Sequence, residues 1–139
     1  FTSKGKLIDG IFIELRKIKE PLTEDKLKRI IRLHGKFVDI LRKMARDKNT
    51  VRSFASKYMH FHCPAVPIFD NVALGVIRRR DWYPLTNRKI EKLAVSQSAD
   101  DIYYDYCRRF FAMYKDLNDS GLPVGVRRLD NYLLWSNEE

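Results

Sequence analysis

The chain has 139 residues, of which 45% are apolar and 32% charged, so it is long and apolar enough to bury the core of one domain. This composition excludes an intrinsically disordered chain, and no apolar run approaches the roughly 20 residues that span a bilayer. The formal net charge is +9. We expect one domain over residues 1–139, either a whole protein or a fragment of a longer chain, with no signal peptide.

The positive charge is concentrated in the first two-thirds of the chain. Residues 1–92 carry 22 Lys and Arg against 10 Asp and Glu, whereas residues 93–139 carry 5 against 8. Such an asymmetry predicts a phosphate-bearing partner, with nucleic acid first and an anionic membrane surface second. The alternative is a solvated basic surface without a specific partner. The two cysteines do not form a disulfide framework, which favours a reducing, cytoplasmic location.

Helical spacing of apolar residues dominates the first half of the sequence. Residues 4–19 form the first expected helix, and Thr23 is placed to cap a second one that runs to about residue 46. His34 lies on the apolar stripe of that second helix, so we expect it in the core. The third expected helix covers residues 51 to about 61, with Thr50 as its cap.

Two prolines then separate the third helix from a fourth, which Asp70 is placed to cap. A short helix is expected over residues 87–95. Ser98 can cap a long aromatic helix to residue 117, and Pro123 can open a last helix to about residue 135. The residues expected on the inner side of the aromatic helix are Ile102, Tyr103, Tyr106, Phe110, Met113 and Leu117. No segment alternates with period two, so the sequence predicts one all-α domain of six or seven helices.

An unusual density of polar side chains marks the segment between the third and fourth helices. His60, His62 and Cys63 are all zinc-binding residue types, but no second pair follows at ligand spacing, so we expect no metal site. Glycine-rich phosphate loops are absent from the sequence, and no cofactor is expected.

Lys57 and Asp70 are the two candidates for chemistry in this segment. A partly desolvated lysine can act as a nucleophile, and an aspartate at a helix N-terminus is held ionised by the helix dipole. Such an aspartate can stabilise a positive charge that develops on a sugar. The structural alternative is that Asp70 only caps a helix and Lys57 only solvates the surface.

The segment A-V-P-I-F-D-N-V-A-L-G-V-I-R-R, residues 65–79, resembles the proline-valine-aspartate segment of helix-hairpin-helix DNA glycosylases. The preceding A-S-K-Y-M-H, residues 55–60, is similar to the start of the family helix that carries a lysine nucleophile in bifunctional members. The resemblance covers roughly residues 50–83. It implies a wholly helical fold, DNA as the partner, a flipped nucleotide, and cleavage of the N-glycosidic bond by Asp70 with Lys57.

The same resemblance and the basic composition suggest which other residues would contact nucleic acid. Aromatic candidates for stacking on a flipped base are Tyr58, Phe69, Trp82 and Tyr83. The residues predicted to bind nucleic acid are Arg52, Ser56, His60, His62, Arg78, Arg79, Arg80, Tyr83, Arg88 and Lys89.

Two alternatives to an enzyme stay open at the level of the sequence. The family hairpin usually contains glycines that grip a DNA phosphate, and no glycine occurs between Gly35 and Gly75. This difference favours a non-catalytic nucleic-acid-binding module, for example in a regulatory or phage-defence protein. The other alternative is a helical protein-interaction domain whose basic face meets an acidic protein partner.

Overall fold

Six helices make up the described part of the chain, which is residues 2–44, 50–78 and 99–136 of a computed structural model. The helices are α1 (Thr2–Leu15), α2 (Glu24–Arg42), α3 (Val51–His62), α4 (Asn71–Arg78), α5 (Asp101–Asp119) and α6 (Val126–Ser136). These residues contain no strand, which confirms the all-α prediction for them. The short helix expected over residues 87–95 lies outside this part. No helix within it combines the length and apolar character needed to cross a bilayer.

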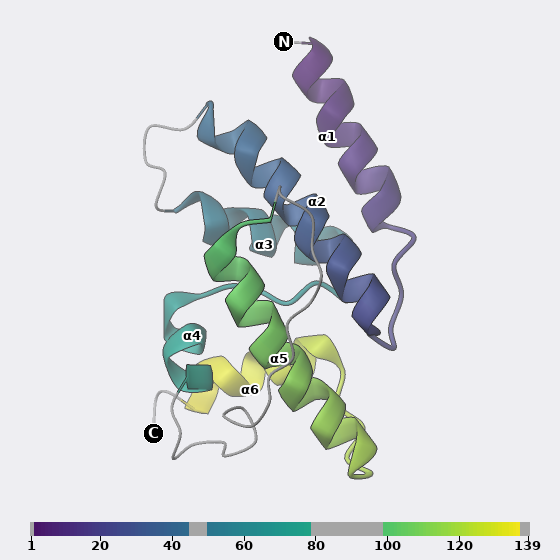
Figure 1. The fold of residues 1–139 in the computed structure, drawn as a ribbon, viewed down its shortest axis with the longest axis vertical. Coiled ribbons are helices and arrows are strands. Elements are labelled where there is room, and N and C mark those ends of the chain that lie inside the picture. The colour runs from purple at the N-terminus through teal and green to yellow at the C-terminus, as the bar shows by residue number, and fades with distance from the viewer. Residues whose placement is uncertain (1, 45–49, 79–98, 137–139) are drawn as a thin grey trace.

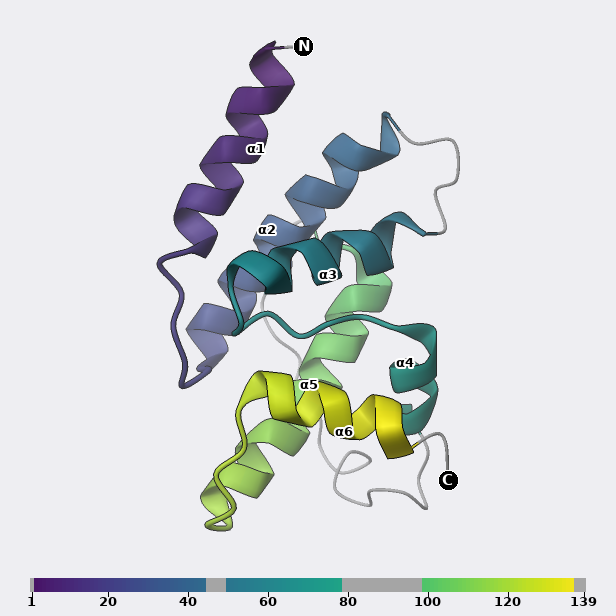
Figure 2. The ribbon, with the colours of Figure 1, turned by 180° about the vertical axis from the view of Figure 1, so that it is seen from behind.

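Helix α2 lies at the centre of the arrangement and contacts α1, α3 and α5. Helices α1 and α2 run antiparallel beside one another, and α3 crosses them on one side (Figures 1 and 2). Helix α4 packs against both α5 and α6. The extended link between α3 and α4 passes across the middle of the molecule, as Figure 2 shows.

Side-chain caps fix where three of the helices begin. The Thr23 hydroxyl accepts a hydrogen bond from the backbone amide of Lys26 at 3.3 Å, which confirms Thr23 as the cap of α2. Asp70 Oδ1 accepts from the amide of Val72 at 2.7 Å at the start of α4. Helix α5 is capped by Asp100, whose Oδ1 accepts from the amide of Tyr103 at 2.9 Å, so the prediction of Ser98 as its cap was wrong.

The last helix, α6, begins at Val126 and not directly at Pro123, and a distant side chain caps it. Glu20 Oε1 accepts from the amide of Val126 at 2.9 Å, across 106 positions of sequence. The side chain of Asn118 holds the preceding turn through hydrogen bonds to both the N–H and the C=O of Val124. A link of this kind between distant segments has no signature in local sequence.

The core combines apolar side chains from all six helices with one histidine. His34 is fully buried, as predicted, and its ring stacks on Tyr103 with 3.7 Å between centroids and 19° between planes. Four of the six aromatic-helix residues expected to face inward are fully buried, and Leu117 is half-buried. Ile102 is 40% exposed, so its predicted inward orientation was wrong.

Candidate nucleic-acid interface

The polar side chains around residues 53–70 support the link between α3 and α4. The Ser56 hydroxyl accepts from the amide of Phe69 at 2.8 Å and donates to the carbonyl of Ser53 at 3.0 Å. The His60 Nδ1–H donates to the carbonyl of Val66 at 2.8 Å. An extended segment inside a core has no helical hydrogen bonds, so side chains must satisfy its backbone groups.

Helices α5 and α6 complete this support. The Tyr103 hydroxyl donates to the carbonyl of Pro67 at 2.7 Å, and the buried Asp130 accepts from the amide of Ile68 at 3.2 Å. Burial raises the pKa of Asp130 well above its usual value, against the effect of the Ile68 amide. The density of polar residues in this stretch of sequence is therefore explained by their support of the link at residues 63–70. We call this link and the side chains that hydrogen-bond to it the buried joint.

Lys57 and Asp70 lie together at the edge of this joint. Lys57 Nζ is 3.9 Å from Asp70 Oδ2, and the two side chains are 56% and 27% exposed. Asp70 also caps α4, as the structural alternative expected. A lysine nucleophile benefits from a desolvated setting, whereas Lys57 is mostly exposed and faces a carboxylate.

Two residues predicted to contact nucleic acid have structural roles instead. Ser56 is fully buried, with its hydroxyl used inside the joint. Arg52 is mostly buried: its Nε donates to Asp100 at 2.6 Å, and its guanidinium lies 5.6 Å from the centre of the Phe69 ring. Neither side chain is presented to a nucleic acid, because burial and internal hydrogen bonds occupy both.

The other predicted contact residues are half-buried, ion-paired or outside the described residues. His60 and His62 are half-buried, and His62 packs edge-on against Phe12. Arg78, exposed at the end of α4, pairs with Asp105 at 2.9 Å. The predictions that fall outside the described part of the chain concern Arg79, Arg80, Trp82, Tyr83, Arg88 and Lys89.

The three zinc-binding residue types near the end of α3 do not converge. His60 turns to the link, His62 packs against aromatic rings, and the buried Cys63 thiol donates to the carbonyl of Ile18 at 3.3 Å. Burial raises the pKa of this thiol. Among the residues that the structure describes, no three His, Cys, Asp or Glu side chains are placed to hold a metal ion.

A buried charge network beside this joint was missed by sequence reasoning. Asp100 accepts from Arg42 at 3.0 Å and from Arg52 at 2.6 Å, and the His34 Nε2–H donates to the Arg52 carbonyl at 3.2 Å. Although burial opposes its ionisation, hydrogen bonds from Arg52 and the Tyr103 amide hold the pKa of Asp100 below its usual value. The signal in sequence was Asp100 itself, which directly precedes the first turn of an aromatic helix.

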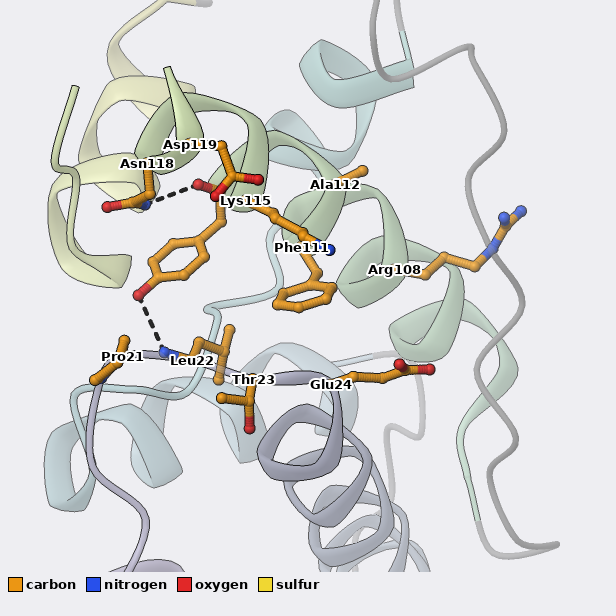
Figure 3. Close-up of a pocket in the computed structure, with 11 residues that line it drawn as sticks. Pro21, Leu22, Thr23, Glu24, Arg108, Phe111, Ala112, Lys115, Asn118 and Asp119 are labelled. Carbon is orange, nitrogen blue, oxygen red and sulfur yellow. Dashed lines mark hydrogen bonds between the residues drawn. The ribbon is translucent and has the colours of Figure 1, made fainter. Parts of the chain in front are cut away.

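One hollow lies between residues 21–24 and α5, with a volume of about 550 Å³. Figure 3 shows Leu22, Phe111 and Ala112 along its walls, with Lys115 and Asp119 nearby. The Tyr114 hydroxyl on its inner side accepts from the amide of Leu22 at 3.1 Å and donates to Glu20 at 3.3 Å. Two acidic and two basic side chains line this hollow, so its charge selects neither anions nor cations.

A second hollow, of about 380 Å³ between α1 and α2, is strongly basic. We call it the basic groove and define it by Lys17, Arg29, Arg32 and Lys36. Glu14 is its one acidic lining residue. Within residues 2–44, 50–78 and 99–136, none of the four basic side chains forms an ion pair with a carboxylate.

Helix register explains why these charges gather. Arg29, Arg32 and Lys36 follow one another at three- and four-residue spacing, so they share one exposed face of α2. On α1, Phe12 faces α3, and Glu14 points about 200° away from it, towards the groove. The groove therefore opens on the side of the α1–α2 pair opposite α3. The sequence contained this signal in residues 29–36, but the prediction concentrated on residues 52–89.

Comparisons of the chain with protein-family models, with curated proteins and with solved structures found no match.

Proposed function

We propose that this protein binds nucleic acid through the phosphate backbone, with the basic groove as its main contact surface. The observation that carries the proposal is a set of four exposed cations in one hollow that have no carboxylate partner in the described structure. Unpaired like charges repel one another and are held together only by the fold. Phosphates that enter the groove relieve this repulsion and release their own counterions.

The dimensions of the groove support a polyanion rather than a single phosphate. Arg29 and Lys36 are seven residues apart on α2, a separation of about 10 Å along the helix axis. Lys17 adds a charge from the end of α1. A nucleic acid strand carries a charge about every 3.4 Å along its axis, so it can satisfy such an array at several points.

The proposal predicts that charge must be removed from the groove, and not merely from the protein, to weaken binding. The R29Q/R32Q variant should bind a labelled 20-nucleotide strand about 10-fold or more weakly at 100 mM salt, because two phosphate contacts are lost. Fluorescence anisotropy measures this affinity.

The matched control is R127Q/R128Q, which removes the same net charge from two exposed positions on α6. This control should bind nearly as tightly as the unmodified protein. Equal losses for the two variants would show that only net charge matters, and would contradict a specific role for the groove. No binding by the unmodified protein at low salt would contradict nucleic acid as the ligand.

Base excision is a second candidate, favoured by the 3.9 Å approach of Lys57 to Asp70 and by the resemblance to helix-hairpin-helix glycosylases. In this reaction the Lys57 amine attacks C1′ of the sugar, the C1′–N bond to the base breaks, and the base leaves with the proton that the amine gives up. Opening of the sugar ring at the C1′–O4′ bond then gives a Schiff base, which borohydride reduces to a stable adduct. If this candidate is correct, the unmodified protein forms an adduct with abasic DNA. The K57A variant should not form the adduct, whereas K115A, at another exposed lysine, should still form it. The candidate also requires base release that D70N abolishes. The absence of both adduct and base release would exclude it without affecting the basic groove.

A further inference from the structure

Helix α3 carries an exposed aromatic face that lies outside the basic groove. Phe54, Tyr58 and Phe61 are 53%, 42% and 80% exposed. Together with Lys57 they occupy positions i, i+3, i+4 and i+7, so all four lie on one side of the helix. Three large rings exposed side by side are characteristic of a binding surface rather than of scattered surface residues.

Phe54 and Tyr58, two rings of this aromatic face, pack against other rings. Phe54 and Tyr58 lie nearly parallel, with 5.9 Å between centroids and 10° between planes. Tyr58 is fixed in turn by edge contacts with Phe12 at 5.3 Å and with His62 at 4.9 Å. Ordered rings lose little conformational entropy when a flat partner stacks on them.

The end of α1 carries basic side chains on the side of α3 as well as on the side of the basic groove. The amide of Arg16 still donates to the carbonyl of Phe12, at 3.0 Å, so the helical register continues to this residue. Arg16 is exposed one turn beyond Phe12, on the side of α1 that faces α3. The next residue, Lys17, lines the basic groove. Exposed cations at the end of α1 therefore lie on both the groove side and the α3 side of this helix.

We propose that the ligand is single-stranded nucleic acid, whose phosphates occupy the basic groove and whose unpaired bases stack on Phe54, Tyr58 and Phe61. This inference rests on the proposed function. A duplex hides the faces of its bases and resists bending around a helix, whereas a single strand offers both flexibility and exposed rings. An acidic protein partner offers charge without stacking bases, so the rings and the net charge of +9 together favour a strand.

The test compares a 20-nucleotide single strand with the corresponding duplex, by anisotropy at fixed salt. The protein should bind the single strand at least about 10-fold more tightly, and F54A and F61A should each weaken that binding about fivefold or more. F61L keeps apolar area but removes the ring, so it should lose affinity as F61A does. L122A, at another exposed apolar residue, should leave binding unchanged. The three side chains that are replaced, Phe54, Phe61 and Leu122, are all exposed, and circular dichroism checks that each variant is folded.

The outcomes separate this inference from the proposed function. If the single strand and the duplex bind equally, and the ring variants have no effect while R29Q/R32Q still weakens binding, then the aromatic inference is wrong and the groove proposal stands. If F61L binds like the unmodified protein, apolar contact and not stacking is the mechanism, and the inference is wrong. If polyglutamate competes as well as the single strand, charge alone explains binding and the bases contribute nothing. If no nucleic acid binds, both proposals are wrong.

Discussion

Replacement of Asp100 by alanine is expected to lower the free energy of unfolding by about 3 kcal/mol. The substitution removes the cap of α5 and leaves the mostly buried Arg52 without its carboxylate partner. Arg42 contributes less to this loss, because its side chain is 36% exposed and water can replace the ion pair. Urea unfolding followed by circular dichroism measures the change at neutral pH.

The neighbouring Asp101 provides the control for this prediction. It is exposed in the first turn of the same helix, so D101A should cost less than about 1 kcal/mol. D100N keeps an oxygen for the Tyr103 amide but loses the charge, so its effect should lie between those of D101A and D100A. Equal stability of D100A and D101A would show that the buried network does not stabilise the fold as described.

Acidification should destabilise the protein through His34. Burial lowers the pKa of His34 to about 4, although its hydrogen bond to the Arg52 carbonyl and the charge of Asp100 act in the opposite direction. The unfolded chain takes up a proton near pH 6.5 and the folded chain does not, so this contribution is present above pH 6.5 and lost as the pH falls towards 4. From pH 7.5 to pH 5 the loss from this residue should be about 2 kcal/mol.

Substitution of His34 by glutamine isolates this contribution. The glutamine amide can still donate to the Arg52 carbonyl, as the ring does at 3.2 Å, but it does not titrate. The difference in unfolding free energy between the unmodified protein and H34Q should therefore shift by about 2 kcal/mol in favour of H34Q between these pH values. The subtraction cancels Asp130, whose raised pKa acts with the opposite sign. A difference that stays constant with pH would contradict a buried neutral histidine.

Local sequence predicted the helices because their signals are local. The stripe of α2 and its cap at Thr23 are visible within a few residues, and so is the cap of α4 at Asp70. The cap of α5 was assigned to Ser98. The ion-pair partners of Asp100 are Arg42 and Arg52, and both are far from it in sequence, so local sequence does not favour Asp100 over Ser98. Contacts of this kind depend on packing, which periodicity does not describe.

In the candidate site, too, the contacts that depend on packing could not be predicted from local sequence. The sequence named Lys57 and Asp70 as candidates without fixing their distance, and the fold places them 3.9 Å apart. Ser56, however, was predicted to bind nucleic acid. The hydrogen bond from the Phe69 amide to its hydroxyl depends on how the link between α3 and α4 folds back, which the residues around Ser56 do not indicate. The spacing of Arg29, Arg32 and Lys36 on α2 was visible in the sequence, but the addition of Lys17 to the same groove depends on the packing of α1 against α2.

The dependence of affinity on salt tests the central claim most directly. If the four cations of the basic groove each meet a phosphate of a single strand, a plot of log K against log salt concentration should have a slope of about −3. The R29Q/R32Q variant should then give about −1.5, and R127Q/R128Q should keep the slope of the unmodified protein. Parallel lines for all three proteins would contradict the claim, because the groove would then hold no phosphates.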